Sequence, residues 1–215
     1  MIFADQLIVL HSTRTGEKSL VMHCLSRRLG RRSFLVTAGS KVPQALWQPL
    51  SLLNAELIEN PHSDLWRLRS LVAEEPLSGI RSNPAKNAVS LFMSEVLYRV
   101  MRSGTGDAAF FDWCAAQIRL FDSLEEHYAS FHLCFLLGLC RELGFAPDAG
   151  SIAPFAGPCL GRLTTLCSAD TATALLLPMK GEDRSAIAAV LLQYLSYHAE
   201  CNLEVKSLAV LREIF

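Results

Sequence analysis

The sequence predicts an α+β protein, with a small β-barrel or sandwich at the N-terminus and a mostly helical body after it. The first 75 residues hold five short β-prone or apolar stretches separated by polar turn residues. That arrangement is typical of a small barrel or sandwich. From about residue 83 the apolar residues recur at spacings of three and four, which is the period of an amphipathic helix.

Turn signals bound the five expected strands. The first strand covers residues 2–11 and ends in the polar run Ser12-Thr13-Arg14-Thr15-Gly16. A second polar stretch, residues 26–32, contains Gly30 and separates the second strand from the third. Gly and short polar residues favour turns because they tolerate the backbone angles that turns require. The remaining strands are expected at residues 19–25, 33–37, 46–58 and 65–72.

The helical body begins with a recognisable start signal. Asn83 can cap a helix whose first residue is Pro84, since proline has no N–H to leave unpaired in the first turn. Further helices are expected at residues 108–120, 123–143, 184–198 and 207–214. The helix over 123–143 has apolar residues on almost every face, so it should be the buried central helix. We therefore expect two domains, 1–78 and 79–215, with an irregular Pro- and Gly-rich segment at about 145–168.

Composition excludes several classes of protein. With 215 residues, of which 51% are hydrophobic and 19% charged, the chain can form a packed core and is not globally disordered. Its longest apolar run, residues 131–140, is well short of the roughly 18 to 20 residues that cross a bilayer. Asp5 interrupts the first apolar stretch, which argues against a signal peptide. Seven cysteines, several of them inside apolar runs, indicate reduced core residues in a cytoplasmic protein.

Catalytic and metal-binding motifs are weak. The run Gly16-Glu17-Lys18-Ser19 resembles the end of a phosphate-binding loop, but the G-x-x-x-x-G-K-[ST] pattern is not met. No G-x-S-x-G nucleophile elbow occurs. Four side chains could in principle supply zinc ligands, but no C-x-x-C pair occurs, so ordinary structural roles are favoured; they are Cys159, Cys167, His198 and Cys201. We therefore expect that the protein is not an enzyme and that it binds no metal ion and no cofactor.

A basic cluster is the strongest functional signal. The net charge is −1, yet residues 1–70 carry +4 and the remainder −5. Four arginines lie within six residues at the turn between the second and third strands. Cations on adjacent turns of a small barrel fit a groove for a phosphate backbone. From the residues alone, a solvated turn that binds no ligand is an equally good interpretation. The candidate DNA-binding residues are Arg14, Lys18, Arg27, Arg28, Arg31, Arg32 and Lys41.

Short motifs in a characteristic order resemble the bacterial RecO family of recombination mediators across nearly the whole chain. Three features of the N-terminal part resemble the family pattern: the first strand at Leu7-Ile8-Val9-Leu10, the glycine Gly30, and the end of the third strand at residues 35–41. Further similar segments are Leu46-Trp47-Gln48-Pro49-Leu50, Asp64-Leu65-Trp66-Arg67-Leu68-Arg69, residues 76–80, 88–98 and 131–147, and the closing Lys206-Ser207. Many relatives carry a zinc finger built from two C-x-x-C pairs. Residues 148–157 here hold no cysteine, so the chain resembles a zinc-free branch. Ala38 also stands where the family usually has a lysine.

The resemblance implies an N-terminal OB-fold that binds DNA, followed by a mostly helical C-terminal domain. It also implies a non-enzymatic mediator in DNA repair, which binds single- and double-stranded DNA and promotes strand annealing. With RecR, such a protein helps to load RecA onto DNA coated by single-strand-binding protein. The implied partners are therefore DNA, RecR and the C-terminal tail of single-strand-binding protein, with no membrane and a nucleoid-associated location in the cytoplasm. An alternative interpretation is a protein-interaction adaptor whose basic barrel binds another subunit instead of DNA.

Overall fold

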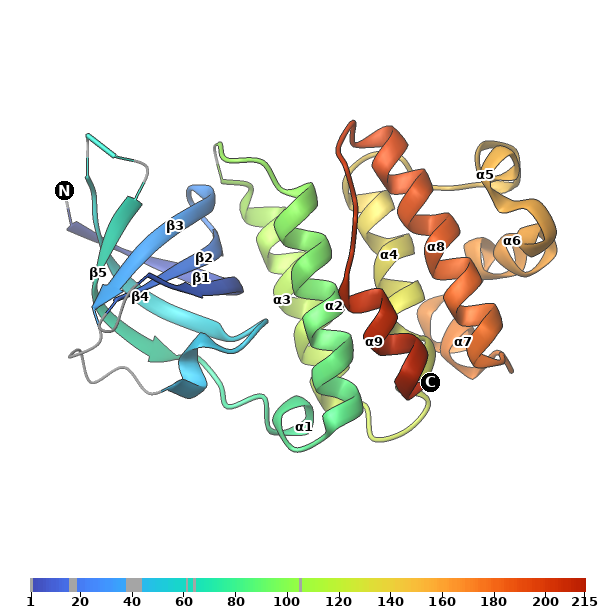
Figure 1. Cartoon of the computed structure of the whole chain (residues 1–215), viewed down its shortest axis with the longest axis horizontal. Helices are drawn as coiled ribbons and strands as arrows, with labels where there is room; N and C mark the ends of the chain where they lie inside the picture. The colour runs from blue at the N-terminus through green and yellow to red at the C-terminus, as the bar shows by residue number, and fades with distance from the viewer. Residues whose placement is uncertain (1, 16–18, 38–43, 61, 64, 105) are drawn as a thin grey trace. The chain divides into compact units, whose positions relative to one another are not determined.

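The computed structural model describes residues 2–15, 19–37, 44–60, 62–63, 65–104 and 106–215 (Figure 1). The chain divides into two compact units. Unit 1 comprises Met1–Ser78 and Ser94–Asp122, and unit 2 comprises Gly79–Met93 and Ser123–Phe215. A boundary near residue 78 was expected, but the segment Ser94–Asp122 belongs with the strands of unit 1.

The strands of unit 1 form a closed five-stranded barrel in the order β1-β2-β3-β5-β4. Strands β3 and β5 run parallel, and the other neighbouring pairs are antiparallel. This is the OB-fold, so the predicted N-terminal barrel is confirmed. The strands are β1 (Ile2–Arg14), β2 (Ser19–Ser26), β3 (Gly30–Thr37), β4 (Leu52–Ile58) and β5 (Leu65–Ala73), with the short 3₁₀ helix η1 (Gln44–Trp47) before β4.

Alternation of apolar and polar residues explains why these segments form a barrel. Side chains of a strand point alternately to its two faces, and every second residue of the first part of β2 is buried. The interior is filled by residues such as Leu7, Met22, Phe34 and Leu53, each of which is 0% exposed. Full burial of one such side chain stabilises the fold by about 1.5–3 kcal/mol. The polar faces of the strands therefore lie on the outside of the barrel, where other groups can contact them.

Two helical segments complete unit 1: the second half of α2 (Pro84–Val100) and α3 (Ala108–Ser123). The Asp107 carboxylate caps α3 by accepting a hydrogen bond of 3.0 Å from the backbone N–H of Phe110. Farther along α3, the Arg119 guanidinium lies 2.8 Å from Glu74 and 2.6 Å from Glu75. Both carboxylates follow β5, so this pair of contacts ties α3 to the end of the barrel.

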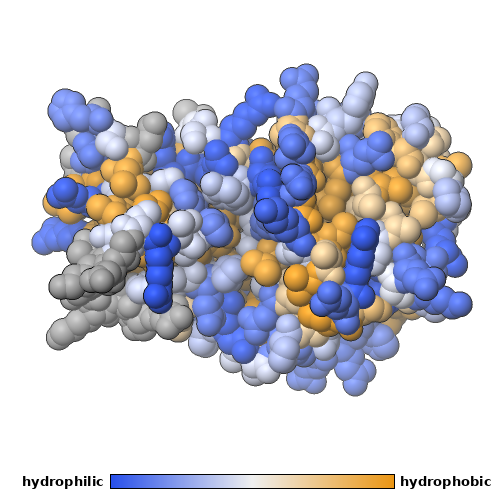
Figure 2. All heavy atoms as spheres, viewed as in Figure 1, coloured by the Kyte–Doolittle hydropathy of each residue, from blue (hydrophilic) through white to orange (hydrophobic). Residues whose placement is uncertain are grey.

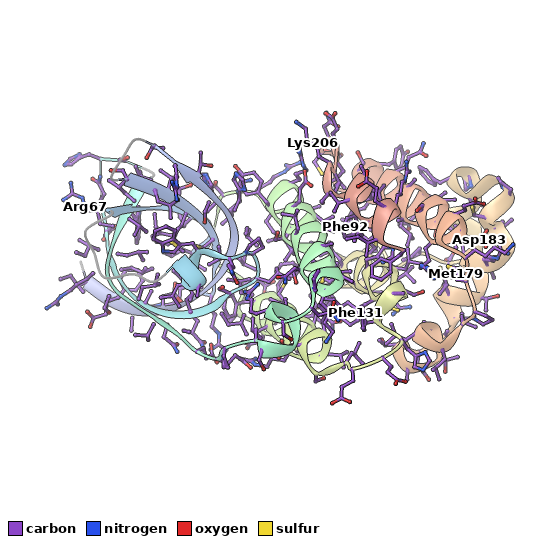
Figure 3. All side chains as sticks on the ribbon, turned by 60° about the horizontal axis from the view of Figure 1, so that its bottom comes forward. Arg67, Phe92, Phe131, Met179, Asp183 and Lys206 are labelled. Atoms are coloured by element: carbon purple, nitrogen blue, oxygen red, sulfur yellow. The ribbon has the colours of Figure 1, made fainter. Side chains whose placement is uncertain are left out.

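Unit 2 is built around α4 (Phe131–Glu142), whose buried residues lie on almost all sides of the helix. The prediction of a buried central helix is confirmed, although the helix begins at Phe131 and not near Ser123. His127 has a left-handed backbone with φ 56°, which interrupts a right-handed helix. Phe92 and Phe131 point into this helical core (Figure 3), and both are 0% exposed. The other helices are α1 (Ser78–Arg81), η2 (Tyr128–Ser130), α7 (Thr171–Leu176), α8 (Gly181–His198) and α9 (Ser207–Ile214).

The expected helix start at Asn83 is confirmed in detail. Its side-chain Oδ1 accepts hydrogen bonds from the backbone N–H groups of Ala85, at 2.9 Å, and Lys86, at 3.2 Å. These two N–H groups have no partner inside the helix, so the asparagine satisfies them.

The expectation of an irregular segment at 145–168 is wrong, because most of it is helical. It forms α5 (Ala149–Ala156), η3 (Gly157–Cys159) and α6 (Leu160–Ser168). Asp148 and Ser151 form a reciprocal capping box at the start of α5. Gly157, with φ 47°, ends that helix, and proline occupies the first turn of η3. Gly157 and the proline of η3 therefore mark the boundary between these two helices, whereas Pro154 lies inside α5.

Several apolar side chains of unit 2 remain at the surface. Figure 2 shows hydrophobic patches on this face of the molecule. In unit 2, Leu176 is 63% exposed and Tyr197 is 69% exposed. Among the described residues, no helix is both long enough and apolar enough to span a membrane.

Candidate nucleic-acid interface

The turn between β2 and β3 carries the arginine cluster, and β1 holds it in place. Ser26 and Gly30 are paired across the hairpin, and Gly30 has the positive φ of 67° that a three-residue hairpin loop needs. The Ser26 hydroxyl donates a hydrogen bond to the buried Asp5 carboxylate and accepts one of 3.0 Å from the Leu29 N–H. The backbone N–H of Arg27 donates to the Gln6 carbonyl at 3.0 Å. The position of the turn is thus set by contacts within unit 1.

A loop that follows α2 also lies against this turn. The Gly106 N–H donates a hydrogen bond of 3.2 Å to the Arg28 carbonyl. A Cβ atom at position 106 would lie 2.2 Å from the Arg28 carbonyl carbon, closer than any van der Waals contact allows. Only glycine fits at this point of close backbone approach.

Arg27 and Arg31 make contacts with helices of unit 1. The two Arg27 Nη atoms donate to Gln6 Oε1 at 3.1 Å and to Asp112 Oδ2, on α3, at 2.6 Å. Arg31 Nη1 donates to the carbonyl of Tyr98, in the last turn of α2, at 2.6 Å, where carbonyls have no partner inside the helix. Its guanidinium also lies 4.9 Å from the centre of the Tyr98 ring. Both side chains therefore hold the turn to the helices.

Two histidines lie beside the Arg31 contact. The rings of His11 and His23 are stacked with centroids 6.0 Å apart, and both rings pack against Tyr98. His23 Nδ1 lies 2.8 Å from the Ser33 hydroxyl. Burial, together with the nearby His11 and Arg31, lowers the pKa of His23 below its usual range.

Arg28 and Arg32 lie against aromatic rings. The Arg28 guanidinium is 4.8 Å from the centre of the Phe3 ring, and that of Arg32 is 5.9 Å from Trp66. Phe3 and Trp66 meet edge to face at 6.0 Å, so one aromatic pair orients both cations. Arg28 is an exposed residue, and so is Arg14 at the end of β1. Lys18 and Lys41 lie outside the described residues.

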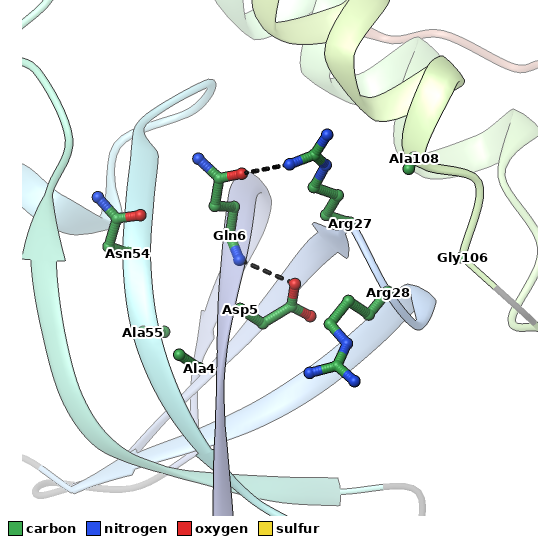
Figure 4. Close-up of a pocket in the computed structure, with 9 residues that line it drawn as sticks. All are labelled: Ala4, Asp5, Gln6, Arg27, Arg28, Asn54, Ala55, Gly106 and Ala108. Atoms are coloured by element: carbon green, nitrogen blue, oxygen red, sulfur yellow. Dashed lines mark hydrogen bonds between the residues drawn. The ribbon is translucent and has the colours of Figure 1, made fainter.

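A pocket of about 650 Å³ opens next to the turn (Figure 4). It is lined by Ala4, Asp5, Gln6, Arg27, Arg28, Asn54, Ala55, Gly106 and Ala108. Sequence reasoning missed Gln6 and Asn54, because a single neutral amide carries no motif. They are brought together by the barrel register, which pairs Gln6 on β1 with Asn54 on β4.

Two cysteines, Cys134 and Cys140, lie on α4. Burial raises the pKa of Cys134 to about 11 and that of Cys140 to about 12, so these thiols are protonated near neutral pH. Within the described ranges, no group of three or more His, Cys, Asp or Glu side chains is placed to hold a metal ion.

Comparison with known proteins identifies the family. The family profile described as Recombination protein O C terminal matches residues 81–151. The chain is 31% identical to DNA repair protein RecO of Bacteroides fragilis, with 97% of each chain covered. It is 28% identical to the protein of the same name from Phocaeicola vulgatus, again over 97% of each chain, and 26% identical to that of Flavobacterium psychrophilum over the full length of both. With the barrel followed by helices, these similarities show that the chain belongs to the RecO family.

Proposed function

We propose that this chain acts in DNA repair as a recombination mediator and not as an enzyme. It binds single- and double-stranded DNA through the barrel and promotes annealing. With RecR, it helps to load RecA onto DNA coated by single-strand-binding protein. The names of the full-length relatives support a role in repair. The observation that carries DNA binding is the exposed Arg28 guanidinium, oriented by Phe3 on a turn of the OB-fold.

The seven proposed DNA-binding residues then have different roles. Arg28, Arg32 and Arg14 contact phosphates, because aromatic rings orient the first two and the third is exposed at the end of β1. Arg27 and Arg31 act mainly by holding the turn, since helical groups of unit 1 already bind their guanidinium groups. Lys18 and Lys41 belong to the proposed set on their sequence position alone. Contacts to phosphates give affinity without reading base sequence, which suits a mediator that must act on any strand.

Partner binding is the second half of the proposal. A mediator that acts on coated DNA must contact the coat protein, and an apolar groove with a cationic edge on the helical body would suit an acidic, apolar C-terminal tail. Exposed apolar side chains on unit 2 support a docking surface there.

The test is a salt titration with labelled DNA followed by fluorescence anisotropy. Each phosphate contact contributes a slope of about −0.7 in log affinity against log salt for a single strand. Losing one contact therefore reduces the drop in affinity between about 50 and about 200 mM salt by roughly threefold. We expect Arg28→Glu to weaken binding and flatten this slope. The matched control is Arg212→Glu, which makes the same charge change at an exposed residue of unit 2.

Two results would count against the proposal. Absence of binding by the natural chain at low salt would remove DNA as a ligand and favour the adaptor interpretation. An identical slope for Arg28→Glu and the natural chain would remove Arg28 from the interface.

A further inference from the structure

We propose that the pocket beside the β2–β3 turn receives one unpaired nucleotide of single-stranded DNA, with the base facing Asn54 and the phosphate at Arg28. This inference rests on the proposed DNA binding and makes it more specific. A pocket that binds the base allows the chain to distinguish an unpaired base from a paired one. Phosphate contacts alone do not make this distinction.

The size and position of the pocket suit one nucleotide. Its volume of about 650 Å³ lies within the range of about 300–1,000 Å³ that is usual for small-molecule sites. It opens next to Arg28, the exposed cation of the turn (Figure 4). A strand whose backbone is bound at Arg28 therefore has a hollow beside it.

Asn54 supplies the group that a base would bind. Asn54 is exposed, and Figure 4 marks no hydrogen bond from its side-chain amide to the other residues that line the pocket. A free amide offers both a donor and an acceptor, and this pair matches the edge of a base whose own partner strand is absent. In a duplex the Watson–Crick edge of each base is already paired, so an amide inside this pocket can bind that edge only when the base is unpaired.

Gln6 forms a wall of the pocket and is held in one orientation. Its Oε1 accepts a hydrogen bond of 3.1 Å from Arg27, and its Nε2 donates one of 3.3 Å to Glu74. Because the barrel pairs Gln6 with Asn54 across β1 and β4, the two side chains lie side by side on one face. The pocket therefore presents one occupied amide and one free amide.

The charges in the pocket indicate which end of the nucleotide lies where. The buried Asp5 carboxylate accepts hydrogen bonds from the Ser26 hydroxyl and, at 2.8 Å, from the Gln6 N–H. Because both of its oxygens already accept hydrogen bonds, Asp5 offers a phosphate no donor, and the Arg27 charge is balanced by Asp112. Arg28 is then the cation left for the phosphate, while the neutral base occupies the part of the pocket near Asn54.

The test compares Asn54→Leu with the natural chain on three DNA probes: a single strand, an abasic single strand of equal length, and a duplex. One net hydrogen bond corresponds to about 2- to 10-fold in affinity. We expect a loss of that size for the normal single strand only, with an unchanged salt slope. Asn202→Leu, at an exposed residue of unit 2, is the matched control.

The outcomes separate this inference from the proposed function. If the natural chain binds the single strand with a steep salt dependence but Asn54→Leu binds equally well, the pocket assignment is wrong and DNA binding stands. An equal loss on all three probes would also refute it, because the pocket would then not read the base. Absence of binding by the natural chain removes both proposals.

A second measurement does not depend on folding of the leucine variant. Asn54→Ser keeps a small polar side chain, and a single strand containing 2-aminopurine reports directly on base stacking by its fluorescence. We expect the natural chain to raise this fluorescence as the base leaves the stack, and Asn54→Ser to reduce the rise. An unchanged signal on binding of the natural chain would contradict the inference.

Discussion

Acid should destabilise unit 2 through His132, whose imidazole lies inside the helical core. The residue is only 2% exposed, and its ring meets Phe92 edge to face at 5.8 Å. Nδ1 is buried and has no hydrogen-bond partner among the described residues. Burial is the main cause that lowers the pKa of His132 from 6.5 to about 4, and the nearby Arg184 charge lowers it further. A hydrogen bond to the Ala129 backbone opposes this shift in part. The folded protein therefore keeps this ring neutral.

The sign of the pH effect follows from the lowered pKa. Between pH 6.5 and about 4 the unfolded chain binds a proton that the folded chain does not bind. Stability is therefore complete above pH 6.5 and falls as the pH drops toward 4. Each pH unit in this window costs about 1.4 kcal/mol, so the difference between pH 7 and pH 4 amounts to about 3 kcal/mol from this one residue.

Urea unfolding of the natural chain and of His132→Leu, followed by far-UV circular dichroism across this pH range, measures the effect. We expect the leucine variant to lose about 3 kcal/mol less than the natural chain between pH 7 and pH 4. His132→Gln, which keeps a donor, should behave like His132→Leu. The control is His127→Asn, at an exposed histidine whose left-handed backbone asparagine tolerates. Parallel pH curves for the natural chain and both His132 variants would refute the reasoning.

Three other substitutions test the contacts around the β2–β3 turn. Asp112→Asn should lower stability by less than about 1 kcal/mol, because the Arg27–Asp112 ion pair lies at the surface. The change releases Arg27, so it should raise the affinity for a single strand several-fold at low salt. A fall in affinity would contradict this. Gly106→Ala should lower stability by about 1–3 kcal/mol and weaken DNA binding, because the new methyl group overlaps the β2–β3 turn. Thermal melts measure the loss of stability. The control is Gly104→Ala, since position 104 has open space around it. Ser26→Ala removes a donor from a buried carboxylate, so urea unfolding should show a loss of about 1–3 kcal/mol; an unchanged midpoint would show that the contact contributes nothing.

Local sequence patterns were enough to predict most of the fold. Five β-prone or apolar stretches separated by turn residues predicted the barrel strands. The start of α2 at Pro84 and the bounds of α9 (Ser207–Ile214) were also predicted correctly. The errors occurred where Gly and Pro were interpreted as loop residues. Gly157 and the proline of η3 lie at helix ends, and Pro154 lies inside α5, although the same residue types also favour loops.

The sequence by itself determined that the arginines gather at one turn, since neighbours in the chain stay neighbours in a hairpin. It could not determine which of them are available to a ligand. Tertiary structure decided that, by bringing Asp112 to Arg27 and Tyr98 to Arg31 from 85 and 67 residues away. It also placed Asn54 beside Gln6, 48 residues earlier, through the pairing of β4 with β1. Hydrogen bonds and ion pairs act over a few ångströms in space, so the partners of a side chain depend on the fold and not on distance along the chain.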